Sequence, residues 1–483
     1  MKTENIQDIY ELSPVQKGIL FHSLYTPELG LYFIHFSYTV RGNLNVGAFE
    51  QAWQEIATRY TILRTSFYWQ EIDKPLQVVH QKVTVPFEFQ DWRDKDSKQQ
   101  DEFLKSFLLS DRQRGFDLSQ APLMRLTVIR LAEDVYQIVW SKHHLILDGW
   151  SAPILIEEVF KQYKAQCQGK DVSLPPTRPF KEYIAWLRKQ DLSKAESFWR
   201  KLLEPVQAPT PLTNIEVKNL SGEEKYDEQQ MRLSAETTAT LQSIARQHEL
   251  TINTIFQGAW AILLSRYTCQ KQVVYGCGVS GRPVDLTGVE SMVGVFINTL
   301  PVYIQIEPEQ FLMVWLKQLQ KQQIEMRQYE YSPLVEIQGW SKVPRNQTLF
   351  ESIVVFENYP EVQIEQSGED DLEILNFNGF YKTNYTLNVI GYPGSQLVIG
   401  INYNGQRFDT STITGILKDF EILLQGMADN PKVKLKQLSF LTPKQQQITS
   451  ILEKETSGWN FYKFSYQGNI IFKFYKTYLN YAD

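Results

Sequence analysis

Two adjacent histidines, His143 and His144, lie at the end of an apolar run and precede Asp148-Gly149. The chain has only six histidines, so composition alone does not predict such a pair. Apolar and polar residues alternate up to Lys142, which predicts a strand, and Asp-Gly is typical of a turn. A histidine held where a strand meets a turn can present a ring nitrogen to a substrate, so the pattern favours proton-transfer chemistry.

Only one of the two histidines is expected to do chemistry, because neighbouring strand residues point to opposite faces. We interpret His143 as a core histidine whose ring is hydrogen-bonded by backbone. His144 lies nearer the turn and is the candidate functional residue. Beyond the turn, Ser151 is predicted to be the N-cap of a helix that runs to about Gln166.

Asp148 is interpreted as structural rather than catalytic. An aspartate before a glycine commonly forms an Asx turn. A second structural interpretation pairs its carboxylate with a buried arginine, since a charge inside an apolar environment should be paired. Arg64 is the candidate partner, because it lies in the apolar window 62–67.

Two other chemistries are disfavoured by the sequence around their motifs. Gly276, Gly278 and Gly281 have the G-x-G-x-x-G spacing of dinucleotide sites. No helix pattern opens at the third glycine, so no helix N-terminus is expected to bind a pyrophosphate. Zinc is disfavoured because adjacent strand histidines diverge and no third ligand lies nearby. We expect no directly bound cofactor and no metal.

Composition restricts the partners and the compartment. The net charge is −6 and no lysine- or arginine-rich stripe occurs, which disfavours nucleic acid as a partner. Cys167, Cys269 and Cys277 lack metal-ligand or redox spacing and fit a reducing compartment. The first residues form no apolar leader and no 18-residue apolar run occurs, so we expect a cytoplasmic protein that does not bind membranes.

A chain of 483 residues predicts two lobes rather than one. We expect an N-terminal lobe over 1–175, a C-terminal lobe over 176–450 and an atypical aromatic-rich tail over 451–483. Both lobes are predicted to be α/β with mixed sheets, which excludes a Rossmann fold and a barrel. The predicted helices include 13–25, 47–60, 98–110, 180–187, 309–327 and 411–427. The predicted strands include 64–69, 76–80, 122–131, 135–142, 299–306, 350–357, 373–377, 384–391 and 396–403.

The stretch His143–Gly149 matches the H-H-x-x-x-D-G motif of a superfamily that includes chloramphenicol acetyltransferase and the condensation domains of nonribosomal peptide synthetases. Other segments resemble further condensation-domain motifs, from about residue 9 to residue 450. They are the opening motif at 12–24, the R-H-x-x-L-R-T-x-F motif at 59–67 with Tyr60 in place of its histidine, the inter-lobe motif at 183–186, Ser-Gly-Arg-Pro at 280–283 and G-x-F-x-N-T at 294–299.

The resemblance implies a fold and a reaction. The fold would be two chloramphenicol-acetyltransferase-like lobes in a V-shaped pseudo-dimer, with a substrate tunnel between them. The reaction would be peptide bond formation, in which the amine of an acceptor aminoacyl thioester attacks a donor acyl or peptidyl thioester. Both substrates would be carried on phosphopantetheine arms of donor and acceptor peptidyl carrier proteins, as part of secondary metabolite biosynthesis.

The resemblance also implies residue roles. His144 would be the catalytic histidine, Asp148 and Arg64 would form a structural ion pair, and Gly149 would keep the loop open beside the substrate. A free α-amine has a pKa of about 7.7–8.0, so a useful fraction is already neutral at pH 7. We therefore expect His144 to position the substrates and to accept a proton late, rather than to act as a strong base.

Three points stay open at this stage. Segments 13–22, 148–151 and 331–338 resemble condensation domains that take a D-configured donor residue. A catalytically inactive recruitment module and a truncated remnant are the alternatives to an active enzyme, and acyl transfer from coenzyme A to a small amine or alcohol is chemically adjacent. The tail does not resemble the usual continuation into an adenylation domain, so that partner is expected in trans or lost.

Overall fold

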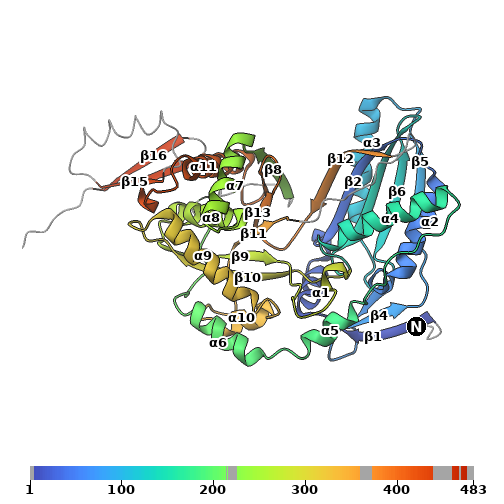
Figure 1. Cartoon of the computed structure of the whole chain (residues 1–483), viewed down its shortest axis with the longest axis horizontal. Coiled ribbons are helices and arrows are strands. Elements are labelled where there is room, and N and C mark those ends of the chain that lie inside the picture. The colour runs from blue at the N-terminus through green and yellow to red at the C-terminus, as the bar shows by residue number, and fades with distance from the viewer. Residues whose placement is uncertain are drawn as a thin grey trace, which may run out of the picture. The chain divides into compact units, whose positions relative to one another are not determined.

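The computed structural model describes residues 5–213, 215, 226–358, 372–438, 460–466 and 469–475. The backbone divides into two compact units that are not contiguous in sequence. The first comprises Met1–Asp191, Ser280–Asn298 and Tyr359–Asn384, and the second comprises Leu192–Val279, Thr299–Asn358 and Tyr385–Asp483. Each unit combines helices with a mixed sheet (Figure 1), which confirms the predicted α/β class.

The first unit is built on a five-stranded sheet in the order β12-β2-β7-β6-β5. β5 and β6 run parallel, and the other neighbouring strands run antiparallel. A smaller sheet has the order β1-β4-β3. The strands are β1 (Ile6–Glu11), β2 (Phe33–Arg41), β3 (Thr65–Tyr68), β4 (Leu76–His80), β5 (Phe87–Asp91), β6 (Met124–Arg130), β7 (Val135–His143) and β12 (Glu373–Tyr381). The helices are α1 (Pro14–Tyr25), α2 (Val46–Arg59), α3 (Ser97–Arg114), α4 (Ser151–Cys167) and α5 (Lys181–Leu187).

Strand β7 sorts its side chains between two faces of the five-stranded sheet. Tyr136, Ile138 and Trp140 belong to the core cluster that also contains Trp53 of α2, and the two indole rings lie 4.9 Å apart. The intervening residues of β7 point to the other face, because side chains alternate along a strand. Ser141 is buried on that face in a polar network.

That network is centred on Asp111 of α3. Its carboxylate accepts hydrogen bonds from Arg125 Nε at 2.6 Å, Ser141 Oγ at 2.5 Å and His35 Nε2 at 2.9 Å. Burial alone would raise the pKa of Asp111, but these hydrogen bonds hold that pKa well below its ordinary value. The network therefore joins α3 to β2, β6 and β7 through a buried, ionised carboxylate.

The second unit has a six-stranded sheet in the order β10-β9-β11-β13-β14-β8. Its strands are β8 (Tyr226–Arg232), β9 (Gln272–Val279), β10 (Asn298–Gln305), β11 (Ser352–Phe356), β13 (Leu387–Tyr392) and β14 (Val398–Asn404). Its helices are α6 (Leu192–Leu202), α7 (Ala235–Gln247), α8 (Ile252–Thr268), α9 (Leu312–Arg327), α10 (Leu334–Trp340) and α11 (Thr410–Asp429). Helix α8 lies in the core, with Phe256 and Trp260 fully buried against Phe420 of α11.

The structure adds to the predicted elements in two places that matter for the site. β2 was not predicted; most of its residues are buried, without strict alternation, and it lies between β7 and β12. β12, predicted as a strand from residue 373, joins the sheet of the first unit. Most of the tail 451–483 lies outside the described residues. Its described part consists of two antiparallel strands, β15 (Asn460–Tyr466) and β16 (Asn469–Tyr475). Within the described ranges, no helix combines the length and hydropathy needed to cross a bilayer.

Asp111→Asn is expected to lower the free energy of unfolding by about 3 kcal/mol, because Arg125 would stay buried without an opposite charge. Urea denaturation of both proteins measures the change. The control is Asp91→Asn, which disrupts an exposed ion pair with Arg93 and should change the stability much less. Equal losses in the two variants would contradict a stabilising role for the buried network.

Candidate active site

The two histidines lie where β7 ends beside β2. His143 is the last residue of β7 and pairs with Phe33. The backbone N–H of His144 donates to the carbonyl of Tyr32 at 2.9 Å, and Ile146 N–H donates to His143 O at 3.2 Å. A strand therefore delivers the pair and a tight turn follows it, as the sequence predicted.

The ring of His143 is held inside the protein by contacts with the turn and with α1. Its side chain is buried, its Nδ1 accepts the Leu145 N–H at 3.2 Å, and its Nε2 lies 3.4 Å from Ser23 Oγ. Because Nδ1 accepts a hydrogen bond, the ring proton resides on Nε2. Burial lowers the pKa of His143 to about 3, and the neighbouring His144 adds to the effect. The ring is therefore neutral and holds the turn together.

His144 has the opposite tautomer. Its Nδ1 lies 2.8 Å from the carbonyl oxygen of Leu147, which can only accept, so Nδ1 carries the proton. Burial lowers the pKa of His144, Lys142 lowers it further, and Asp148 opposes both. Nε2 is thus left with a free lone pair on a neutral ring, which is the state that a proton acceptor requires.

Lys142 was not singled out by the sequence. Its side chain is fully buried, with Nζ 4.2 Å from the ring centroids of both Phe36 and Trp140. Burial lowers its pKa to about 7, while Asp148 favours the charged form. The aromatic rings can stabilise the ammonium. A cation near His144 makes protonation of the imidazole less favourable.

Asp148 is the centre of the turn. Its Oδ1 accepts the Ser151 N–H at 2.8 Å and the Ser151 Oγ–H at 2.7 Å, and its Oδ2 accepts the Phe296 N–H at 3.0 Å. Ser151 is the first residue of α4 rather than its N-cap, and the carboxylate of Asp148 satisfies its N–H. The side chain is buried and fully used in holding the loop, which supports the structural interpretation.

The predicted ion pair between Asp148 and Arg64 is wrong. Arg64 is buried, but its guanidinium donates to the carbonyls of Ala57 and His80 and to the side chain of Gln7. The cation beside Asp148 is Arg282, whose Nη2 lies 3.5 Å from Oδ1. Backbone carbonyls satisfy Arg64, so its burial did not require a carboxylate.

Arg282 belongs to the segment 280–298, which packs on the turn in the first unit. Asp148 N–H donates to Gly294 O at 3.0 Å, and Gly294 N–H donates to Ser151 Oγ at 3.1 Å. A Cβ atom at position 294 would lie 2.2 Å from the ring of Phe180, so only glycine allows the backbone to lie this close to Phe180. The Ser-Gly-Arg-Pro motif that contains Arg282 was the signal that could have identified this partner.

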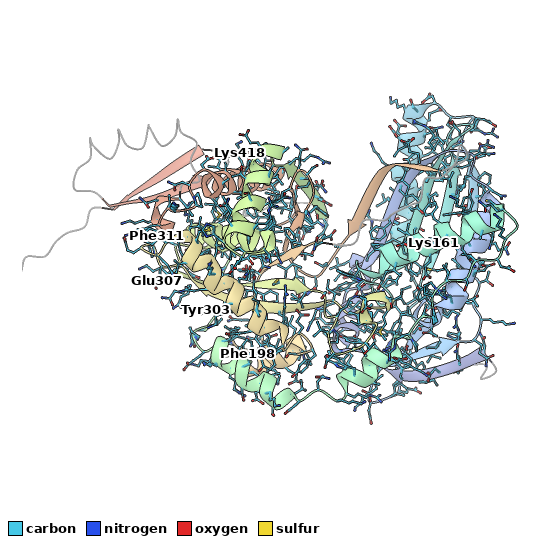
Figure 2. All side chains as sticks on the ribbon, in the orientation of Figure 1. Lys161, Phe198, Tyr303, Glu307, Phe311 and Lys418 are labelled. Carbon is cyan, nitrogen blue, oxygen red and sulfur yellow. The ribbon has the colours of Figure 1, made fainter. Side chains whose placement is uncertain are left out.

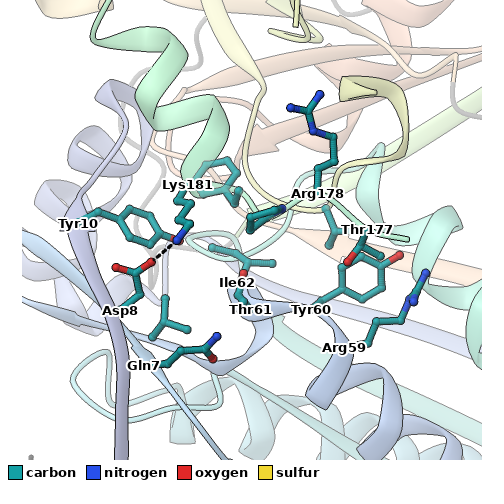
Figure 3. Close-up of a pocket in the computed structure, with 14 residues that line it drawn as sticks. Gln7, Asp8, Tyr10, Arg59, Tyr60, Thr61, Ile62, Thr177, Arg178 and Lys181 are labelled. Atoms are coloured by element: carbon teal, nitrogen blue, oxygen red, sulfur yellow. Dashed lines mark hydrogen bonds and ion pairs between the residues drawn. The ribbon is translucent and has the colours of Figure 1, made fainter. Parts of the chain in front are cut away.

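The hollow shown in Figure 3 lies elsewhere in the first unit. Its volume is about 250 Å³, and its lining includes Tyr10, Arg59 and Lys181. The ammonium of Lys181 lies 2.8 Å from the carboxylate of Asp8. None of the residues 143–149 lines it. A second hollow, of about 380 Å³, is lined by Trp150 and Arg282 and so adjoins the Asp148 turn.

In the described part of the chain, no three His, Cys, Asp or Glu residues form a group that could hold a metal.

Comparisons with known proteins identify the family of the chain. The family model of the condensation domain matches residues 6–449. A linear gramicidin synthase of Brevibacillus parabrevis is 46% identical over 453 residues, covering 92% of this chain and 6% of that protein. Bacitracin synthase 3 of Bacillus licheniformis is 33% identical over 448 residues, covering 92% of this chain and 7% of that protein. The chain therefore spans a small part of each of these relatives.

Solved structures share the fold. A four-domain nonribosomal peptide synthetase bound to AMP and glycine superposes with a TM-score of 0.78 at 18% identity, covering 91% of this chain and 34% of that one. The starter condensation domain of rhizomide synthetase gives a TM-score of 0.76 at 19% identity, covering 90% of this chain and 98% of that one.

Arg282→Met is expected to lower the free energy of unfolding by about 3 kcal/mol, because it removes the cation that is paired with the buried Asp148 carboxylate. The control is Lys161→Met, which removes an exposed ion pair with Glu157 on α4 (Figure 2) and should change stability far less. Urea denaturation compares the two. A loss no larger than that of the control would show that Arg282 does not stabilise the turn.

The stability should fall in acid because His143 stays neutral in the fold. The unfolded histidine titrates near 6.5 and the folded one near 3, so between these values the unfolded state binds the extra proton and stability rises with pH. From pH 6.5 to pH 4 the natural protein should lose about 3 kcal/mol more than His143→Asn, whose amide oxygen replaces the Nδ1 acceptor. Denaturation curves across this range measure both, and parallel losses would contradict the assignment.

Proposed function

The chain belongs to the condensation-domain family, and on that basis we propose that it joins a donor acyl or peptidyl thioester to an acceptor aminoacyl thioester through a peptide bond. The observation that carries this proposal is the neutral His144 ring. Its Nδ1–H is fixed on Leu147 O, so Nε2 is directed to act as an acceptor. Peptide synthases among the relatives support the assignment.

The reaction balances without an added oxidant, reductant or metal. The neutral amine of the acceptor attacks the carbonyl carbon of the donor thioester, a C–N bond forms, and the carbonyl oxygen becomes negative. The attacking nitrogen is then cationic and acidic, and His144 Nε2 takes its proton. Collapse of the intermediate breaks the C–S bond, and the proton passes to the leaving thiolate.

The surrounding residues are proposed to hold the imidazole of His144, the proton acceptor, in place. Asp148 fixes the turn through Ser151, Phe296 and Arg282. His143 secures the first part of the turn, and Gly149 is half-buried beside Asp148 and would leave room for the substrate. Positioning of this kind can contribute several orders of magnitude to a rate.

The substrates are proposed to arrive on phosphopantetheine arms of donor and acceptor carrier proteins, with an adenylation domain loading the acceptor. We extend the proposal to a D-configured donor residue, which rests on the segments 13–22, 148–151 and 331–338 that resemble such condensation domains. The three described cysteines are free thiols, which supports a reducing, cytoplasmic setting.

His144→Ala is expected to lower the rate of dipeptide formation by more than about tenfold, because the proton acceptor is lost. The affinity for the carriers should stay unchanged, since the ring lies in a buried turn. The measurement follows dipeptidyl carrier by mass spectrometry after mixing loaded donor and acceptor carrier proteins, with L- and D-configured donors in parallel.

His248→Ala is the matched control, because it removes a histidine at the end of α7 in the second unit. A loss of less than tenfold in His144→Ala would contradict the proposed role. Firm carrier binding by the natural protein with no product from any loaded pair would instead favour a recruitment module. Turnover with a soluble acyl-coenzyme A and no carrier would favour the coenzyme A reaction.

A further inference from the structure

Tyr32, directly before β2, has an unusual backbone. Its φ is 63°, in the left-handed region that residues other than glycine, asparagine and aspartate rarely adopt. The side chain is buried. An aromatic residue is held in such a conformation only where its surroundings require it, so the contacts of Tyr32 explain the conformation.

The backbone contacts give the reason. In an antiparallel strand, the N–H and C=O of one residue point to the same neighbouring strand. Tyr32 instead donates its N–H to Lys382 O at 2.8 Å, beside β12, and accepts the His144 N–H at 2.9 Å, beside β7. The left-handed conformation turns the carbonyl from one neighbour to the other. Tyr32 thus ends β2 by bonding to both adjoining segments.

The side chain of Tyr32 makes a second connection between the same two segments. Its hydroxyl donates to Asn384 Oδ1 at 2.6 Å. Its ring meets the His144 ring edge to face, with centroids 6.2 Å apart and planes at 66°. The ring of His22 on α1 lies 6.4 Å away from that of Tyr32. The hydroxyl therefore anchors the ring that contacts the imidazole.

We infer that Tyr32 is a positioning residue for His144, and this inference rests on the proposed function of His144 as the proton acceptor. The Tyr32 carbonyl fixes the main chain of His144, and the anchored ring restricts rotation of the imidazole. Both constraints keep Nδ1 on Leu147 O and so keep the lone pair on Nε2. Residues 382–384 contribute to this positioning, because they accept hydrogen bonds from both the backbone N–H and the hydroxyl of Tyr32.

Tyr32→Asn tests the inference, because asparagine tolerates the left-handed backbone but lacks the ring. The expected result is a fall in kcat of about tenfold with the KM for loaded carriers unchanged, since misplacing a reacting group lowers the rate of the chemical step. The matched control is Glu249→Asn, which changes a left-handed residue (φ 57°) in the second unit and should leave kcat unchanged.

A second measurement observes the tautomer of the His144 imidazole directly and needs no substrate. In protein labelled with 15N-histidine, NMR should show His144 as the Nδ1–H tautomer in the natural protein and in Glu249→Asn. In Tyr32→Asn the His144 signals should move toward averaged tautomers. The tautomer is measured without turnover. A failure of the proposed function can therefore be distinguished from a failure of the positioning role.

Tyr32→Phe and Asn384→Ala remove the same hydrogen bond while leaving the Tyr32 backbone and ring in place. Each should lower kcat by about twofold to fivefold, and the double variant should lose no more than the larger single loss, because the two groups act as one pair. Unchanged kcat and an unchanged His144 tautomer in Tyr32→Asn would overturn the inference, as would additive losses in the double variant.

Discussion

The buried carboxylate of Asp148 is the interaction on which the arrangement of the site depends. Its two oxygens accept hydrogen bonds from Ser151 at the start of α4 and from Phe296 in the segment 280–298, and Arg282 lies beside them. One side chain therefore joins the turn after β7, a helix and a distant segment of the chain. A buried carboxylate is costly unless such partners surround it, so these elements are stable together rather than separately.

The two histidines show how backbone groups assign different tautomers to identical side chains. His143 accepts the Leu145 N–H at Nδ1, whereas His144 donates from Nδ1 to Leu147 O. An amide N–H can only donate and a carbonyl can only accept, so each contact selects one tautomer. Burial keeps both rings neutral. The chemical difference between the two residues thus comes from the turn that they share.

The sequence predicted the parts of the site that are encoded in adjacent residues. The alternation in β7, the Asp-Gly turn and the helix from Ser151 are local patterns, and the structure confirms them apart from the capping residue. The partners contributed by distant segments were not predictable in this way. Arg64 was correctly expected to be buried, but a guanidinium has five donors that carbonyls can satisfy, so burial alone did not identify its partner. The position of Tyr32 depends on the order β12-β2-β7, which no local periodicity reveals.

Burial of His144 also limits the chemistry that this site can perform. A lowered pKa means a weaker base, so the ring is poorly suited to removing a proton from an alcohol or from a protonated amine. It is well suited to accepting a proton from the nitrogen of a tetrahedral intermediate, which is far more acidic than the free ammonium. A weak base that is already neutral and oriented needs no preceding deprotonation step. The electrostatics of the turn therefore favour an amine nucleophile over an alcohol, in agreement with the proposed reaction.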